Sequence, residues 1–246
     1  MRALFWNIRA GGGKRAAWIA RQIARWNPDL VGLCEFRATA ASQALAADLS
    51  ALGWSYQLQN TVRGNDAANA VFVCARTPVR RIGLRNDRPD PSRWLLVRPD
   101  VGPDFGILHA PNHVTKRKQA YFERVTAFAK KWRGGPTIIG GDTNCGIPPI
   151  DGNPAMFHRY ETDWIPGLEK AGWRDAFRVF EPDITAYSWY SPNAGNGYRL
   201  DQAFANRSLQ PRLQKVWYEW GAHQDAGSRR DAISDHAALL VDFDWP

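Results

Sequence analysis

Short apolar runs alternate with amphipathic stretches along this chain, and this alternation predicts strands separated by helices. The runs Ala3–Trp6 and Leu30–Cys34 are short and almost wholly apolar, as expected of covered strands. Apolar residues at helical spacing between them predict a helix whose inward face is formed by Ala16, Ile19, Ala20, Ile23 and Trp26. Asn27-Pro28 predicts the helix end, because a residue before proline disfavours helical backbone. The segment is therefore predicted to form a strand–helix–strand unit.

The same pattern recurs in the middle of the chain. Phe105–His109 and Thr137–Gly140 read as strands, and Lys116–Trp132 reads as the helix between them. Polar residues follow the strands of both units: Asn7 and Glu35 in the first, His109 and Asp142 in the second. The recurrence predicts two similar halves that face each other across one cleft, rather than two independent domains. We therefore expect residues 1–246 to form one domain.

The strand before Asp142 ends in a pattern with two interpretations. Gly140 and Gly141 permit a sharp turn or a close approach to a ligand, since they lack Cβ. Asp142 and Asn144 are two residues apart, so extended backbone would point them the same way. A carboxylate beside an amide suits a water, a metal ion or a phosphate oxygen. Glycine, aspartate and asparagine are also common in strand-end turns for local reasons alone.

The remaining pattern completes a layered α/β sandwich. Thr39 is predicted to cap a second helix, which Gly53 closes. Further strands are predicted at Tyr56–Asn60, Ala70–Ala75, Val79–Leu84, Trp94–Val97, Ala186–Tyr190, Tyr198–Phe204 and Ala237–Val241. Helices that alternate with these strands favour packed α/β layers over an all-helical or all-strand fold.

Composition narrows the functional classes. The 246 residues are 44% hydrophobic, which is ample for a packed core and excludes a disordered chain. No run of eighteen apolar residues occurs, and no signal peptide is seen, so we expect a cytoplasmic protein without stable membrane association, unless an export signal was removed. Three widely spaced cysteines are neither a disulfide framework nor a zinc pattern.

The charge of the chain favours an anionic partner. A net charge of +8 and a pI near 9.7 suit DNA, RNA or an anionic membrane face. Arg229-Arg230 is the basic pair we favour for substrate contact, because it lies just before Asp235. Lys116–Lys118 and Arg80-Arg81 could equally be solvated surface.

Eight polar residues at strand ends could carry chemistry: Asn7, Glu35, His109, Asp142, Asn144, Asp201, Asp235 and His236. A histidine on an apolar strand is more often a hydrogen-bonded core residue than a catalyst. Two of the carboxylates could instead form ordinary ion pairs outside any active site. Asp201 could pair with Arg199 or Arg207, and Glu35 could pair with Arg37 or Arg2. As a set they favour a site, because isolated carboxylates rarely sit among buried strand residues without partners.

The set also resembles the endonuclease/exonuclease/phosphatase superfamily, the group of deoxyribonuclease I, exonuclease III and the apurinic/apyrimidinic endonucleases. The motifs that carry the resemblance are Trp6-Asn7-Ile8-Arg9, Cys34-Glu35-Phe36, His109-Ala110-Pro111-Asn112, Gly141-Asp142-Thr143-Asn144, Arg199-Leu200-Asp201 and Ser234-Asp235-His236. The resemblance implies a four-layer α/β sandwich, with two central mixed sheets flanked by helices and the site at one edge of the sheet pair.

The resemblance also implies a metal site. Glu35 would be the principal ligand of Mg²⁺ or Mn²⁺, with Asn7 and Asp235 close by, and Ca²⁺ is possible as a second ion. Oxygen ligands of this kind suit a small divalent cation that keeps several waters.

The same resemblance assigns the reacting groups. His236, oriented by Asp201, would bind the scissile phosphate. Asp142, with Asn144, would position and deprotonate the attacking water. His109 would be a candidate acid for the leaving oxygen.

Two branches of the superfamily compete. Arg9, Arg37 and His109 resemble deoxyribonuclease I, whose arginines at these places touch the DNA backbone. Asn112 and the aromatic pair Trp189 and Tyr198 resemble the repair endonucleases, where such aromatics line the abasic-site pocket. Core packing is the alternative for both aromatics. Residues 65–69 stand where deoxyribonuclease I has a glutamate that assists its histidine.

We therefore expect a monomeric, metal-dependent phosphodiesterase that cleaves DNA, most similar to a deoxyribonuclease I-like endonuclease. The alternatives are an abasic-site or exonuclease III-like repair enzyme, and a phosphatase or phosphodiesterase that acts on a small or lipid phosphate ester. A non-catalytic binding protein is the least favoured, because it would not need all eight polar residues.

Overall fold

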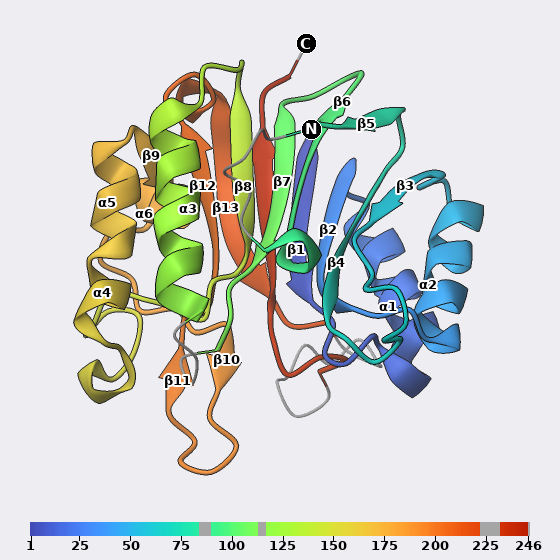
Figure 1. The fold of residues 1–246 in the computed structure, drawn as a ribbon, viewed down its shortest axis with the longest axis horizontal. Coiled ribbons are helices and arrows are strands. Elements are labelled where there is room, and N and C mark those ends of the chain that lie inside the picture. Colours follow the sequence, from blue (N-terminus) through green and yellow to red (C-terminus); the bar gives the residue numbers. More distant parts are fainter. Residues whose placement is uncertain (84–89, 113–116, 222–231, 246) are drawn as a thin grey trace.

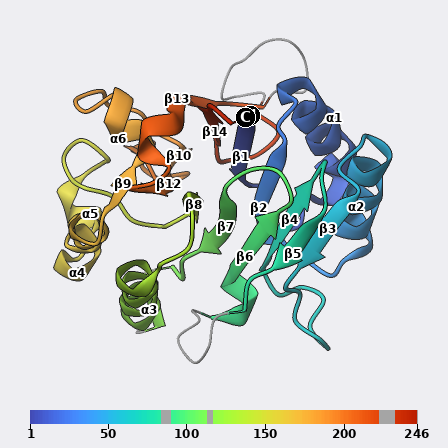
Figure 2. The ribbon, with the colours of Figure 1, turned by 90° about the horizontal axis from the view of Figure 1, so that it is seen from above.

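The computed structural model describes residues 1–83, 90–112, 117–221 and 232–245, which form a layered α/β sandwich. Two mixed six-stranded sheets pack against each other, and helices cover both outer faces (Figure 1 and Figure 2). The predicted α/β fold with two central sheets is confirmed. No helix in the described ranges is long and apolar enough to cross a membrane.

The first sheet contains the first strand–helix–strand unit. Its strand order is β13-β14-β1-β2-β4-β3. The strands are β1 (Arg2–Asn7), β2 (Leu30–Phe36), β3 (Tyr56–Gln59), β4 (Ala70–Ala75), β13 (Leu213–Glu219) and β14 (Ala238–Phe243). β1 and β2 pair in parallel, and α1 (Ala16–Trp26) connects them. α1 and α2 (Ala40–Ala51) lie on the outer face of this sheet (Figure 2).

The second sheet repeats this arrangement. Its strand order is β5-β6-β7-β8-β12-β9. The strands are β5 (Val79–Arg81), β6 (Trp94–Pro99), β7 (Asp104–His109), β8 (Thr137–Asp142), β9 (Trp173–Asp175) and β12 (Asp201–Asn206). β7 and β8 pair in parallel, and the connection between them includes α3 (Arg117–Lys131). The predicted recurrence of a parallel strand pair with a crossover helix is therefore present in both sheets.

Shorter elements complete the second half. They are α4 (Arg159–Thr162), α5 (Trp164–Lys170), α6 (Ala176–Phe180) and the hairpin strands β10 (Trp189–Tyr190) and β11 (Gly197–Tyr198). The hairpin projects beyond the end of the two sheets in Figure 1. α3 and α5 contact each other and pack on the outer face of the second sheet.

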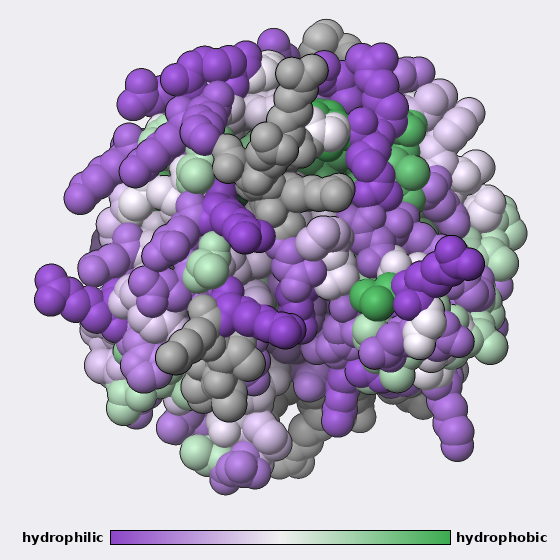
Figure 3. Space-filling view, viewed as in Figure 1, coloured by the Kyte–Doolittle hydropathy of each residue, from purple (hydrophilic) through white to green (hydrophobic). Residues whose placement is uncertain are grey.

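Apolar side chains fill both the space between the sheets and the spaces under the helices. Phe5 of β1 stacks on Phe105 of β7 across the sheet interface, with ring centroids 4.9 Å apart. The five α1 residues predicted to face inward are all buried, and they pack with β1 and β2. Exposed positions on the face shown in Figure 3 are mainly hydrophilic. The amphipathic pattern of α1 in the sequence therefore predicted correctly which face of this helix is buried.

Several predicted strands have different limits in the structure. The strand predicted at 198–204 is divided, because Arg199 and Leu200 leave the ladder to bond with Asp151 and Ser188. β12 therefore starts at Asp201 instead of carrying it in the middle. The strands predicted at 79–84 and 186–190 shorten to β5 and β10, and residue 84 lies outside the described ranges.

Candidate active site

The carboxyl ends of β1, β2, β7 and β8 meet at one edge of the two sheets, near the β10–β11 hairpin (Figure 1). A cavity of about 510 Å³ opens there. The predicted residues that line it are Glu35, His109, Asn112, Asp142, Asn144, Trp189, Asp235 and His236. Asn7 and Asp201 are wholly buried beside them. The structure thus brings all eight strand-end polar residues into one region.

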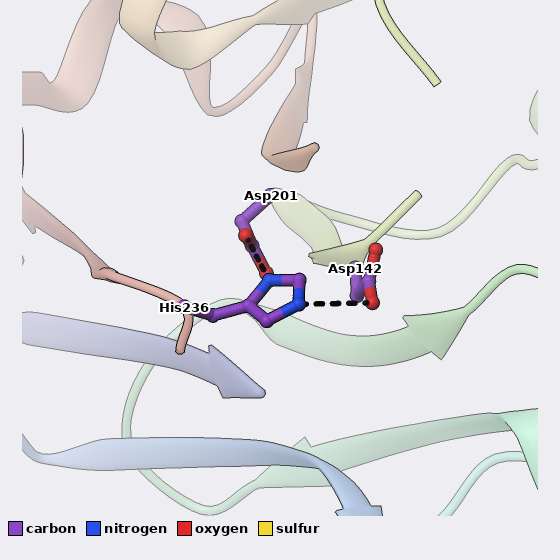
Figure 4. Close-up of side chains that lie close together, drawn as sticks. All are labelled: Asp142, Asp201 and His236. Carbon is purple, nitrogen blue, oxygen red and sulfur yellow. Dashed lines mark hydrogen bonds and ion pairs between the residues drawn. The ribbon is translucent and has the colours of Figure 1, made fainter. Parts of the chain in front are cut away.

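His236 lies between two carboxylates from the second sheet (Figure 4). Its Nδ1 is 2.8 Å from Asp201 Oδ2, and its Nε2 is 4.0 Å from Asp142 Oδ2. β12 pairs with β8 so that Asp201 stands directly opposite Asp142, which explains why both carboxylates reach the same imidazole. The ion pair considered for Asp201 with a neighbouring arginine is absent from the described contacts, because Arg199 pairs with Asp151 and Asp175.

The charges of this cluster depend on its burial. Burial lowers the pKa of the His236 imidazole, but the Asp201 and Asp142 carboxylates outweigh it and raise this pKa to about 10. Burial raises the pKa of Asp142 to about 7, although the His236 charge opposes the shift. His236 is therefore a cation at neutral pH, and Asp142 can exchange a proton in the same pH range.

The atoms of Asp142, Asp201 and His236 also lie within 4.8 Å of one another, a spacing that could hold a metal ion. However, His236 Nδ1 and Asp201 Oδ2 already bond to each other. A metal ion ligated by both atoms would require that bond to break. The arrangement fits a hydrogen-bonded proton-handling group better than a closed metal centre.

Asp142 is the centre of the contacts at this edge. Asn7 Nδ2 donates to Asp142 Oδ2 at 2.8 Å, and His109 Nε2 lies 3.7 Å from the same oxygen. The Asn144 backbone N–H donates to Asp142 Oδ1 at 2.9 Å. Both carboxylate oxygens are thereby held in place, which fixes the direction of the group toward the cavity.

The backbone at Asn144 differs from the prediction. Asn144 has φ +49°, in the left-handed region, so the extended geometry that would align it with Asp142 is wrong. Its side-chain Nδ2 donates instead to the Ala110 carbonyl oxygen at 3.0 Å. Both residues nevertheless line the cavity. A tight turn, rather than strand alternation, brings them together.

His109 is buried, and the Asp142 oxygen 3.7 Å from its Nε2 is too far away for a hydrogen bond. Its Nδ1 has no hydrogen-bond partner among the described residues. Burial, with a smaller effect of the Arg93 charge, holds the pKa of His109 well below its ordinary value. Asn69 of the 65–69 segment lines the same cavity but accepts a hydrogen bond from Arg37 Nε at 2.7 Å. A neutral His109 is poorly suited to the acid role that the resemblance implies.

The two carboxylates on the first-sheet side of the cavity, Glu35 and Asp235, are more exposed to solvent than Asp142. Glu35 is half-buried at a bulge of β2, where φ is +59°. Its Oε2 accepts from the Ala10 backbone N–H at 2.7 Å, and its Oε1 accepts from Asn7 Nδ2 at 3.3 Å. The arginine pairs considered for Glu35 are wrong, since Arg2 pairs with Asp242 and Arg37 donates to Asn69.

Glu35 and Asp235 fit a hard divalent cation. Both line the cavity, and the Asp235 side chain is 39% exposed. Arg9 forms a loose ion pair with Asp235, with its Nε 3.7 Å from Asp235 Oδ2 and 63% of its side chain exposed. Asn7 has its NH₂ group between the two carboxylates Glu35 and Asp142, while its Oδ1 accepts from the Arg9 backbone N–H. Accessible carboxylate oxygens with room for water are the ligands that Mg²⁺ and Mn²⁺ prefer.

The two predicted aromatics have different surroundings. Trp189 is half-buried, lines the cavity, and has its ring centroid 6.3 Å from that of His236. Tyr198 is only 5% exposed, and its ring packs edge-on against Phe157. Core packing is thus the better description of Tyr198, whereas Trp189 can contact a ligand. Arg229 and Arg230 lie outside the described residues.

Several lining residues have no signal in the local sequence. The cavity wall also includes Asn69, Arg93, Lys118, Met156, Phe157, Ser191, Pro192, Asn193 and Leu200. Lys118 belongs to a basic cluster for which the sequence left a phosphate contact and solvated surface equally open, yet it is 1% exposed. Only the spatial placement of its helix and of the 153–161 segment shows that it belongs to the site.

Comparison with known proteins agrees with this geometry. Residues 4–236 match the model of the endonuclease/exonuclease/phosphatase family, so the chain belongs to this family of metal-dependent hydrolases. The predicted resemblance is therefore confirmed. No curated protein matches the chain.

Solved structures share the fold over nearly the whole chain. The 3′ phosphatase NExo from Neisseria, bound to product DNA hairpin, has a TM-score of 0.82 and 21% identity, with 100% of each chain covered. An AP endonuclease from Archaeoglobus fulgidus has a TM-score of 0.82 and 19% identity, with 99% of each chain covered. The 3′–5′ exonuclease NExo from Neisseria meningitidis has a TM-score of 0.81 and 21% identity, again with 100% of each covered.

Proposed function

We propose that this protein is a nuclease that hydrolyses phosphodiester bonds of DNA with a divalent metal ion. The observation that carries the proposal is the cavity itself. On one side it presents a cationic His236 held by Asp201, and on the other it presents the accessible carboxylates of Glu35 and Asp235. The net charge of +8 supports a polyanionic substrate.

The second-sheet residues would handle the phosphate and the proton. The Asp201 carboxylate holds His236 Nδ1, so Nε2 remains to donate a charged hydrogen bond to a phosphate oxygen in the cavity. Asp142 would accept the proton of the attacking water, and Asn144 would help to orient that water. The pKa of Asp142, raised to about 7 by burial, makes this carboxylate a stronger base than an exposed aspartate.

The first-sheet side would hold the metal ion. Glu35 and Asp235 are the proposed ligands, and Asn7 fixes the direction of Glu35. A bound Mg²⁺ or Mn²⁺ ion would supply positive charge near the phosphate and the leaving oxygen. Neutral His109 would donate a hydrogen bond to a phosphate oxygen from its protonated ring nitrogen instead of acting as a charged acid.

Within DNA hydrolysis we propose cleavage inside intact strands, as a deoxyribonuclease I-like endonuclease. Arg9 is exposed beside Asp235 and could reach a backbone phosphate, whereas Asn112, which resembles the repair endonucleases, lines the cavity under either candidate. Arg37 is a further proposed contact, together with Arg229 and Arg230.

A second candidate is processing of an abasic site or a 3′ end. The observation that favours it is the apolar part of the cavity wall, formed by Trp189, Met156, Phe157 and Leu200. Such a wall could accept a sugar that lacks its base, or a terminal nucleotide.

A substrate panel distinguishes the two candidates. Supercoiled plasmid, linear duplex, single strand and an abasic-site duplex would each be incubated with Mg²⁺, Mn²⁺ or EDTA and resolved on gels. Metal-dependent nicking of intact plasmid supports the endonuclease, and cleavage confined to the abasic duplex or to 3′ ends supports the second candidate. Absence of cleavage in every lane would overturn both and direct attention to small phosphate esters.

A further inference from the structure

A buried ion pair lies directly behind the Asn144 turn. Lys118 of α3 is 1% exposed, and Glu161 of α4 is 0% exposed. The Lys118 ammonium forms a salt bridge with the Glu161 carboxylate, and it also donates to the Asn144 carbonyl oxygen at 2.6 Å. The other Glu161 oxygen accepts from the His158 backbone N–H at 2.6 Å. The pair therefore joins α3, the start of α4 and the Asn144 turn.

Burying a charged pair in this space has an unfavourable desolvation free energy. Removing an ammonium and a carboxylate from water costs several kcal/mol, and well-packed apolar side chains of similar size often do as well or better for stability. An apolar pair could not reproduce the hydrogen bond from Lys118 to the Asn144 carbonyl oxygen, nor the one that Glu161 accepts from the His158 N–H. The ammonium is thus explained by what it contacts, not by packing alone.

The Asn144 turn needs to be held. A left-handed backbone costs a non-glycine residue roughly 1 kcal/mol or more, and it persists where surrounding contacts determine it. Three polar groups of Asn144 have partners: its N–H on Asp142, its Nδ2 on Ala110 and its carbonyl oxygen on Lys118. Among the described contacts its Oδ1 has none, so this atom is left to accept a hydrogen bond in the cavity.

Other side chains also hold the residues on either side of Asn144. Gln202 of β12 donates from Nε2 to the Cys145 carbonyl oxygen and accepts from the Thr143 hydroxyl at Oε1. The Cys145 thiol donates to the Glu161 carbonyl oxygen. Lys118 is therefore the member of this set that fixes the peptide at Asn144 itself.

We infer that Lys118, supported by Glu161, is a positioning residue that holds the Asn144 turn and, through it, the Asp142 carboxylate. This inference rests on the proposed function, because it takes Asp142 and Asn144 to be the groups that prepare the attacking water. Lys118 acts through Asn144, whose N–H fixes Asp142 Oδ1. Displacement of the turn would misdirect both the base and the amide oxygen beside it.

The first test measures the backbone protection of the Asn144 turn and needs no substrate. The variant Lys118→Met with Glu161→Gln removes both charges, so neither is left buried alone, and the new amide can still accept from His158 N–H. Lys130→Met with Glu123→Gln is the matched control, since both residues are exposed on the same helix. Hydrogen exchange over residues 143–147 should become about tenfold faster or more in the first variant and stay unchanged in the control. Unchanged exchange in both would overturn the inference, whether or not the protein cleaves DNA.

The second test measures the effect of the same variant on kcat and KM. The double variant should lose roughly 10- to 100-fold in kcat on the DNA substrate, with KM within about twofold and thermal stability close to that of the control. Glu161→Gln alone should retain more of its kcat, because Lys118 still reaches the Asn144 carbonyl. Full kcat in a stable double variant would reduce the pair to a structural role. If the natural protein cleaves no DNA, the proposed function fails, and the exchange measurement still decides the positioning role.

Discussion

The β1–α1–β2 unit and the β7–α3–β8 unit share one topology but present different chemistry at the same edge. Each delivers two polar residues there, Asn7 and Glu35 from the first unit and His109 and Asp142 from the second. Glu35 remains half-buried, whereas Asp142 is 2% exposed. Burial raises the pKa of Asp142 to about 7. The comparison teaches that burial, rather than residue type, separates a carboxylate suited to a metal ion from one suited to a proton.

Local backbone geometry explains the difference in burial. Glu35 stands at a bulge with a left-handed backbone, and the Ala10 N–H anchors one of its oxygens at the cavity mouth. Asp142 ends a regular strand whose partner β12 places Asp201 opposite it, so His236 covers both. Asn7 touches both carboxylates and links the two units.

The largest expected effect comes from the charged imidazole on the second-unit side. His236→Ala should lower kcat by about 10³-fold or more, because a charged hydrogen bond to the phosphate and the Asp201 partnership are lost together. Steady-state cleavage kinetics measure the loss, and circular dichroism checks that the fold persists. Lys170→Ala, which removes an exposed cation at the end of α5, is the control and should stay within about twofold. Near-normal turnover in His236→Ala would remove this residue from the site.

The next effect separates the first unit from the second. Glu35→Gln should raise the half-saturating Mg²⁺ concentration roughly 10- to 100-fold, because an amide is a weaker ligand than a carboxylate. Metal titration of cleavage measures the shift, and Glu123→Gln, which removes an exposed carboxylate elsewhere, is the control. An unchanged metal response would place the ion elsewhere.

The next prediction concerns how the free energy of unfolding depends on pH through His236, which lies beside Asp142 of the second unit. The folded-state pKa of His236, about 10, lies above its ordinary value of 6.5. The stabilisation from its charged form is therefore complete below pH 6.5 and disappears as the pH rises through about 10. In EDTA, the free energy of unfolding should fall between these pH values by about 2 kcal/mol more in the natural protein than in Asp201→Asn. Denaturant unfolding at both pH values measures this, and parallel losses in the two proteins would contradict it.

The smallest effect concerns the exposed arginine at the mouth. Arg9→Ala should reduce the slope of log affinity against log salt by about 1, because one phosphate contact is lost. Binding of a DNA duplex in Ca²⁺ at several salt concentrations measures the slope. Arg174→Ala, at an exposed residue of β9, should leave it unchanged. An equal slope for Arg9→Ala would exclude it as a phosphate contact.

The sequence predicts the framework of this molecule better than the details of its site. Amphipathic spacing and Asn27-Pro28 predict α1 correctly, and the apolar runs locate β1, β2, β7 and β8. These features are local, and one periodicity governs each of them. The strand ends then bring Asn7, Glu35, His109 and Asp142 to one edge, as the recurring pattern suggests.

Residues set by contacts between distant segments were not predictable in the same way. The left-handed turn at Asn144 depends on Ala110 and Lys118, which lie more than twenty residues away in sequence. The division of the strand at Arg199 depends on Asp151 and Asp175. No periodicity or spacing along the chain reports such pairings, so Lys118 resembles ordinary surface until its helix is placed.

One titration tests the central claim most directly, namely metal-dependent DNA hydrolysis with the two units in different roles. Nicking of supercoiled plasmid would be followed against Mg²⁺ concentration for the natural protein, Glu35→Gln and Asp142→Asn. We predict cleavage only with metal, a curve displaced to higher Mg²⁺ for Glu35→Gln, and an undisplaced curve with a plateau about 10²-fold lower for Asp142→Asn. Cleavage that persists in EDTA, or identical curves for the two variants, would contradict it.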